Sequence, residues 1–240
     1  MTESNIVRPL HIGKFIPPPY AGVEAHIDSL LRSLLPEFNV TLAAAKSPGI
    51  SELLPYKVLE ASSFGKFASA TISPGILKIV KDEFISGRSN LLHIHSPNPW
   101  GDFAAISLPK NFPVVISWHS DIVRQKNIMK FYKYIQNKAI QRADKILVAT
   151  PNHYLSSVQL HNFNVESKIV HIPYGIDFSS LHNIPMDYEF MNMLKRFALN
   201  RPIILSVGRH VSYKGFSYLL SAFSKIKNDA VLLMVGSGLR

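Results

Sequence analysis

The sequence predicts an α/β protein whose core is a doubly wound parallel sheet. Short apolar runs of strand length recur along the chain, and stretches with helical periodicity separate them. Apolar residues make up 47% and charged residues 18% of the 240 residues, which is enough apolar material for a sheet covered on both faces. Such alternation is typical of parallel sheets, in which helical crossovers return the chain to the same edge.

The first strand–helix pair is the clearest. Residues 10–16 form an apolar run that ends at three prolines, which cannot continue a hydrogen-bonded ladder and therefore predict a rigid loop. Gly22 then begins a predicted helix that extends to about Leu35, because its apolar residues fall on one helical face. The stretch 46–73 has no clear period. Further strands are predicted at residues 38–45, 91–95, 113–118, 145–149 and 168–173, and further helices at residues 74–85, 100–108, 127–142 and 151–160.

The pattern divides the chain into a first domain at residues 1–177, a linker at 178–201 that holds a helix at 187–199, and a second piece at 202–240. The second piece contains one strand–helix–strand unit, at residues 202–207, 214–226 and 230–235. A piece of fewer than about 40 residues rarely folds alone. We therefore expect the incomplete start of a second doubly wound domain, in a chain truncated at its C-terminus. The alternative is that residues 202–240 extend the first sheet.

The amino-acid composition excludes some classes of function and indicates the kind of partner. Without cysteine the chain has no thiolate nucleophile, disulfide or cysteine-ligated metal. A formal net charge of +10 indicates anionic partners such as nucleotides or phospholipid head groups. Nucleic acid is not expected, because no recognition motif accompanies the charge. No window reaches the roughly 18 apolar residues of a membrane span, so we expect a cytoplasmic protein, soluble or peripheral to a membrane.

The predicted helix at residues 127–142 is basic and amphipathic. Lysines and arginines crowd the region from Arg124 to Lys145, and an apolar stripe of Ile128, Phe131, Ile135 and Ala139 runs along one face. Such a helix can lie against an anionic membrane surface, and we expect it at the inner face of the cytoplasmic membrane. The alternative is a solvated basic face over a stripe that packs into the core.

Polar residues and glycines collect at the carboxyl ends of the predicted strands, where ligands bind in open α/β sheets. Gly22, at a helix start, leaves room for a ligand near free backbone N–H groups. His119 follows an apolar strand and could orient a sugar hydroxyl or share a proton near neutrality; alternatively it is a structural histidine. His93 and His95 point the same way and with His119 raise the question of a metal. No further ligand has a fixed spacing, so no metal site is predicted.

Arg209 and Lys214 flank the loop before the predicted helix at residues 214–226. An arginine can hold a phosphate through two hydrogen bonds, a lysine adds a point charge, and the helix N-terminus adds partial positive charge. A diphosphate is the natural ligand for this set. The alternative is a solvated basic loop.

Five motifs occur in order along the chain. They are the loop HIGKF…PPYAGVE at 11–24, the strand end WHSDIVRQK at 118–126, the segment IPYGID at 172–177, the element VGR…YKGF at 207–216 and the turn VGSG at 235–238. Together they resemble family 4 of the glycosyltransferases with the GT-B fold, and in particular bacterial mannosyltransferase-like members that build surface polysaccharide. The resemblance covers essentially the whole chain. It implies two Rossmann-like halves that face one another, the first binding the acceptor and the second the nucleotide sugar.

The resemblance also implies roles for individual residues. His119 is the implied catalytic residue and would contact the transferred sugar. The donor diphosphate would be bound by Arg209, Lys214 and Gly22. Asn98 and Asp121 would lie on the acceptor side. No metal and no other cofactor is expected, because family members usually work without a metal.

The function implied is that of a retaining enzyme. It would move a hexosyl group, expected to be mannosyl, from a nucleotide-diphosphate sugar to a lipid-linked glycan in polysaccharide or O-antigen biosynthesis. GDP-mannose is the expected donor, with a UDP-sugar as the alternative. The sequence departs from the family pattern at Ala21, where the first of two glycines usually stands, and it lacks the acidic E-x7-E element, which in the family lies beyond the position of Gly238. The alternative function is therefore that of an inactive, truncated remnant that binds acceptor or membrane only.

Overall fold

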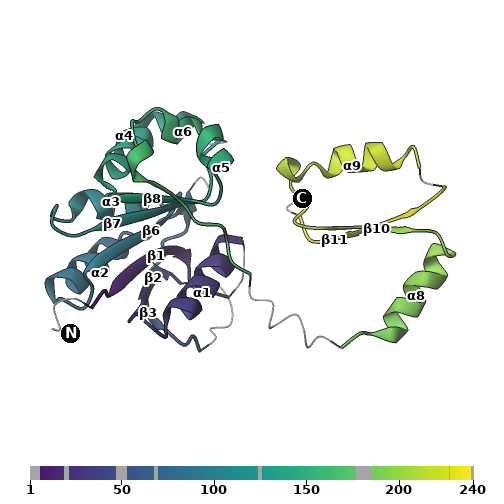
Figure 1. Cartoon of the computed structure of the whole chain (residues 1–240), viewed down its shortest axis with the longest axis horizontal. Helices are drawn as coiled ribbons and strands as arrows, with labels where there is room; N and C mark the ends of the chain where they lie inside the picture. The colour runs from purple at the N-terminus through teal and green to yellow at the C-terminus, as the bar shows by residue number, and fades with distance from the viewer. Residues whose placement is uncertain are drawn as a thin grey trace. The chain divides into compact units, whose positions relative to one another are not determined.

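The computed structural model describes residues 6–18, 22–46, 53–67, 70–123, 126–176, 185–226 and 228–238. The chain divides into two compact units, Met1–Asp177 and Phe178–Arg240, and each is described by itself (Figure 1). Among the described residues no helix is both long enough and apolar enough to cross a membrane.

The first unit is built on a seven-stranded sheet in the order β3–β2–β1–β6–β7–β8–β9. All of its strand pairs are parallel, so the predicted fold class is confirmed. The strands are β1 (Pro9–Phe15), β2 (Thr41–Ala45), β3 (Lys57–Ala61), β6 (Leu91–Ser96), β7 (Val114–Trp118), β8 (Lys145–Val148) and β9 (Ile169–His171). The strand order reverses between β1 and β6, and ligands of such sheets bind at the carboxyl ends of the strands beside this reversal.

Helices cover both faces of the sheet. They are α1 (Gly22–Leu34), α2 (Gly75–Ile85), α3 (Pro99–Ser107), α4 (Lys126–Arg142), α5 (Pro151–Ser156) and α6 (Val158–His161). The unit also contains a 3-10 turn at Glu166–Lys168 and a separate antiparallel pair of short strands, β4 (Lys66–Phe67) and β5 (Ala70–Thr71). On one face, Leu10 and Ile12 of β1 join the large core that includes α2 and α3. On the other, Ile27 and Leu31 of α1 pack against Leu42 of β2.

Strand β3 lies in the stretch for which the sequence predicted no element. It is the edge strand next to β2, and its side chains are mostly exposed or half-buried, so it carries no continuous apolar run. Its Lys57 donates to the buried carboxylate of Glu83 on α2, with 3.2 Å between Nζ and Oε1. This ion pair ties the edge strand to the helix that covers it.

The predicted helix at residues 151–160 is two short helices in the structure. Ser157 interrupts it, because its side chain caps α6 by accepting a hydrogen bond from the backbone N–H of Leu160. The hydroxyl of Ser157 also donates to Asp121 at 2.6 Å. The break therefore follows from a tertiary contact that the local sequence does not reveal.

The second unit contains α8 (Tyr188–Ala198), β10 (Ile203–Val207), a 3-10 turn at Ser212–Lys214, α9 (Phe216–Phe223) and β11 (Val231–Val235). Strands β10 and β11 pair in parallel and form a sheet of their own, so the alternative that residues 202–240 extend the first sheet is wrong. Helix α9 begins two residues later than predicted. The reason is Gly215, whose φ of 71° is left-handed and separates the 3-10 turn from the helix.

The glycines after β11 allow two backbones to approach closely. A Cβ atom on Gly236 would lie 1.9 Å from the carbonyl oxygen of Gly208, and one on Gly238 would lie 2.5 Å from the carbonyl oxygen of His210. The backbone N–H of Gly208 donates to Val235, and that of His210 donates to Ser237. The loop after β10, which carries Arg209, is thereby held by main-chain hydrogen bonds to the last residue of β11 and to the segment that follows it.

Candidate functional site

Four of the residues predicted for a site lie at the carboxyl ends of the central strands in the first unit. Gly22 is the first residue of α1, which follows β1; Asn98 caps α3, which follows β6; His119 and Asp121 follow β7. The backbone N–H of His119 donates to the carbonyl of Ser96, at the end of β6. His119 therefore lies beside the reversal of strand order, where a ligand is expected.

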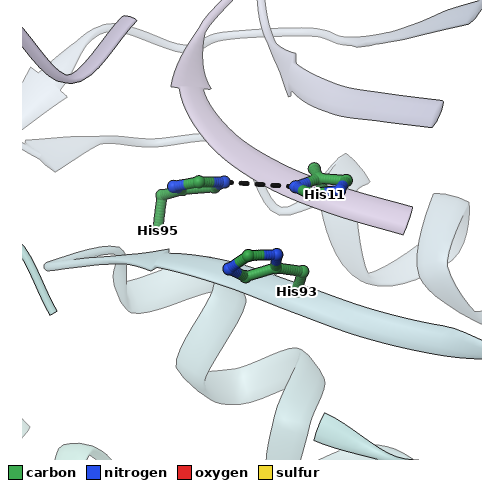
Figure 2. Close-up of side chains that lie close together, drawn as sticks. All are labelled: His11, His93 and His95. Carbon is green, nitrogen blue, oxygen red and sulfur yellow. Dashed lines mark hydrogen bonds between the residues drawn. The ribbon is translucent and has the colours of Figure 1, made fainter. Parts of the chain in front are cut away.

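A chain of side-chain hydrogen bonds connects His119 to the interior. His119 Nε2 is 3.1 Å from His95 Nδ1, and His95 Nε2 is 3.2 Å from His11 Nδ1. On the outer side, His119 Nδ1 is 2.9 Å from the hydroxyl of Tyr174, a residue that follows β9 and is 46% exposed. Figure 2 shows the inner end of this chain, with His11 on β1 facing His95 and with His93 beside them.

Two further imidazoles, those of His93 and His26, complete the cluster. His11 and His93 are register partners on adjacent strands, and their ring centroids are 4.5 Å apart. His93 Nε2 lies 2.8 Å from the hydroxyl of Ser117 on β7. His26, from α1, places its ring centroid 5.2 Å from that of His119 and 4.5 Å from that of Tyr174. The cluster thus draws on β1, β6, α1 and the ends of β7 and β9.

Burial keeps these imidazoles neutral. It lowers the pKa of His119 to about 4, aided by the nearby His26, and it lowers the pKa of His11 to about 3. Burial also lowers the pKa of His93 and His95 well below the ordinary value of 6.5. His119 is therefore suited to orient a hydroxyl through hydrogen bonds. It is not suited to exchange a proton near neutrality, which was one of the two roles that the sequence left open.

Asn98 and Asp121 are engaged by the fold. Asn98 is 7% exposed; its amide donates to the carbonyl of Gly13 at 3.0 Å and accepts from the N–H of Gly101 at 3.2 Å. Asp121 accepts from the indole N–H of Trp118 at 3.0 Å and also from Ser157 and the N–H of Gln159. Both side chains hold loops in place, which is a sufficient structural reason for each residue.

Gly22 is exposed, and a Cβ atom there would meet no atom within 4 Å in the part of the chain that the structure describes. No protein contact in this part therefore requires a glycine at this position. Pro19, Tyr20 and Ala21, which complete the predicted loop, lie outside the described residues.

The two cations predicted to bind a diphosphate lie in the second unit, on either side of Tyr213. Arg209 Nη2 donates to the Tyr213 hydroxyl at 2.9 Å, and Lys214 Nζ lies 5.7 Å from the centre of the Tyr213 ring. Both cations are exposed. Each cation thus contacts the Tyr213 side chain, and Lys214 belongs to the 3-10 turn and not to α9.

The predicted basic helix is α4. Within its described side chains, Ala139 is buried and Ile135 is half-buried, so this part of the apolar stripe faces the core. Lys133 and Lys138 are exposed, and Lys138 Nζ lies 4.4 Å from the ring centre of the exposed Tyr134. Arg124 and the side chains of Ile128 and Phe131 fall outside the described residues.

Residues 20–180 match the sequence profile of Glycosyltransferase Family 4. The chain belongs to this family. It is 28% identical to the O-antigen chain mannosyltransferase C of Escherichia coli, over 97% of this chain and 61% of the relative, and 25% identical to the D-rhamnosyltransferase WbpZ of Pseudomonas aeruginosa, over 97% and 60%. Among solved structures, Anabaena Alr3699/HepE in complex with UDP and glucose shares the fold, with a TM-score of 0.66 and 14% identity, over 97% of this chain and 62% of the other. The chain thus spans about three fifths of the length of the two curated relatives.

His119 was the one member of the cluster that the sequence placed in a binding role. His26 and Tyr174 were missed as site residues, although both stand in or next to the matched motifs. A usable signal was present in β6, where histidines alternate with apolar residues, because that pattern gives the sheet one polar and one apolar face.

Proposed function

We propose that the protein serves a retaining transfer of a hexosyl group from a nucleotide-diphosphate sugar to a lipid-linked glycan of a surface polysaccharide such as O-antigen. Membership of family 4 carries this proposal. The name of one curated relative, a mannosyltransferase of O-antigen chains, favours a mannosyl group and hence GDP-mannose as donor, whereas the other relative is named for D-rhamnosyl transfer. The UDP and glucose bound to the Anabaena structure keep a UDP-sugar as the second candidate.

His119 would orient the transferred sugar. Both of its ring nitrogens have partners, and the outer one, Tyr174, is 46% exposed. A sugar hydroxyl can therefore reach the network by bonding to the Tyr174 hydroxyl or by replacing it at His119 Nδ1. Tyr174, which the sequence did not single out, would then be a binding residue.

The cations of the second unit would stabilise the leaving diphosphate. Two charge-assisted hydrogen bonds, at roughly 1.5–3 kcal/mol each, contribute about 3–6 kcal/mol, whereas millimolar binding already requires about 4 kcal/mol. Arg209 and Lys214 therefore supply only part of the affinity for the donor. Their main effect is expected where negative charge grows on the leaving group. No other cofactor is part of the proposal.

The acceptor hydroxyl must lose a proton during transfer. A histidine whose pKa is held near 4 is a weak base, so His119 is poorly suited to take that proton. This favours a front-face displacement in which the leaving phosphate oxygen helps to deprotonate the acceptor. Asn98 and Asp121, whose polar groups are engaged by the fold, are not part of the acceptor site that we propose.

A lipid-linked acceptor requires access to a membrane surface. The exposed Lys133 and Lys138 on α4, with Tyr134 between them, would contribute on the order of 1 kcal/mol for each basic residue near anionic lipid. We propose peripheral association with the cytoplasmic face of the membrane through this helix.

The decisive experiment measures mannosyl transfer from radiolabelled GDP-mannose to a polyprenyl-diphosphate-linked glycan. Arg209→Ala and Lys214→Ala should each lower kcat/KM by about 10- to 150-fold, the equivalent of one charge-assisted hydrogen bond. Lys225→Ala, which removes an exposed cation elsewhere in the same unit, should retain the wild-type rate. Wild-type rates in both site variants would refute the diphosphate assignment. Acceptor binding without any turnover of the unaltered chain would instead support a non-catalytic remnant.

A further inference from the structure

Three imidazoles meet at the carboxyl edge of the sheet from three different elements. One ring nitrogen each of His26, His95 and His119 lies within 4.8 Å of the other two. His26 comes from α1, His95 from β6 and His119 from the segment after β7. The nitrogens His95 Nδ1 and His119 Nε2 are 3.1 Å apart. Two nitrogens bound tetrahedrally to zinc at 2.0–2.1 Å are separated by about 3.4 Å, so this pair needs only a small adjustment.

We propose that His26, His95 and His119 form a binding site for a divalent transition-metal ion, with Zn²⁺ as the ion that fits them. Three imidazoles are a known ligand set for zinc, and the fourth position then belongs to water or an exogenous ligand. His26 and His119 are half-buried, which leaves the outer side of the trio accessible to solvent. The sequence alone does not predict this set of ligands, because nothing in it brings α1 to the ends of β6 and β7.

The surroundings of the trio match those of metal-bound histidines. Such a histidine normally donates its second ring N–H to an acceptor, which fixes the orientation of the ring. With the ion on His95 Nδ1 and His119 Nε2, the opposite nitrogens would donate to His11 Nδ1 at 3.2 Å and to the Tyr174 hydroxyl at 2.9 Å. His26 has no hydrogen-bond partner for its ring among the described residues. The second-nitrogen partners that a bound ion requires are therefore already in place for His95 and His119.

A second trio, His11, His93 and His95, has equally close nitrogens but suits an ion less well (Figure 2). Its members are 1%, 7% and 2% exposed. A dication held there by neutral imidazoles would lose its hydration without a compensating negative charge from the ligands, which is costly. The outer trio shares His95 but keeps a solvent-facing side.

The test is a calorimetric titration of the untagged full chain with Zn²⁺, supported by the visible absorption of Co²⁺ bound at the same site. One ion per chain is expected. His26→Gln and His119→Gln should each weaken binding by about tenfold or more, and Tyr174→Phe, which removes an acceptor next to a ligand, by about tenfold. His171→Gln is the matched control, because it alters an exposed histidine of the same unit, and His93→Gln should bind as the wild type does. Circular dichroism of each variant would verify that the fold is retained.

Two results would overturn the proposal. One is unchanged affinity in His26→Gln; the other is a loss confined to His93→Gln, which would place the ion in the inner trio. The titration contains neither nucleotide nor sugar, so its outcome does not depend on the proposed transferase function. Where that function also holds, the ion would bind Nε2 of the imidazole whose Nδ1 side orients the sugar.

Discussion

Asp102→Asn is expected to stabilise the first unit by up to about 4 kcal/mol at pH 8 and to have little effect at pH 4. Asp102 is 1% exposed, and burial raises the pKa of its carboxyl from 3.8 to about 7, although the hydrogen bond from the Tyr132 hydroxyl opposes this rise. Between pH 4 and 7 the unfolded chain has released this proton while the folded chain retains it. The free energy of unfolding of the wild type therefore falls by about 1.4 kcal/mol per pH unit in that window. Asparagine removes this dependence and can still accept from Tyr132.

Urea titrations at several pH values would measure the effect. The fluorescence of Trp100 and Trp118, the two tryptophans of the chain, reports on the first unit alone. Tyr132→Phe serves as a second variant; it removes the hydrogen bond that lowers the pKa of Asp102 and should extend the pH-dependent window upward. A constant difference between wild type and Asp102→Asn from pH 4 to 8 would show that Asp102 does not titrate in this range.

Glu83→Gln is expected to destabilise the first unit by about 3 kcal/mol at neutral pH. The side chain of Glu83 is 3% exposed and accepts from Arg88 at 2.7 Å and from Lys57 at 3.2 Å. Breaking a buried ion pair costs about 3–5 kcal/mol, and the lower end applies because both cations are half-exposed and stay hydrated. The same urea titrations would measure the loss, and hydrogen exchange should show it in β3, which Lys57 joins to α2.

The pH dependence of Glu83 has the opposite sign to that of Asp102. Burial raises the pKa of Glu83, but the hydrogen bonds and charges of Arg88 and Lys57 outweigh burial and hold the pKa below its ordinary value of 4.5. The stabilisation is thus present above about pH 4.5 and is lost as the pH falls through the lower pKa of the folded state. Asp82→Asn, in an exposed pair with Lys78, is the control and should change stability by less than about 0.5 kcal/mol. A similar small change in Glu83→Gln would contradict the assigned role.

The sequence predicted the elements whose residues are buried in runs. Strands β1, β6, β7 and β8 are apolar or alternate strictly, and they appear within two residues of the predicted bounds. Strand β3 was missed because an edge strand with a lysine and a glutamate has no apolar run. The break between α5 and α6 was missed because it depends on a contact between Ser157 and Asp121, which are distant in sequence.

The histidine cluster was predictable only in part, because most of its residues come together only in the tertiary structure. His119 could be singled out because it follows an apolar strand. His11, His26 and Tyr174 join it only through the pairing of β1 with β6 and the return of the chain after β9, which is information of tertiary structure. Asn98 shows the converse difficulty, because an asparagine at a strand end can bind a ligand or cap the next helix, and in the fold it caps α3.

Main-chain hydrogen bonds fix the loop after β10, so a side chain of this loop can be substituted while its backbone stays in place. Gly208 and His210 are anchored through their main-chain N–H groups, and the abutting glycines leave no side chain on which that anchoring depends. The side chain of Arg209 can therefore be exchanged while its Cα atom stays in place. The backbone of the loop fixes where residue 209 lies, and its side chain alone determines the charge there. Substitutions at this one residue are therefore expected to change the preference for an anionic ligand without changing the backbone.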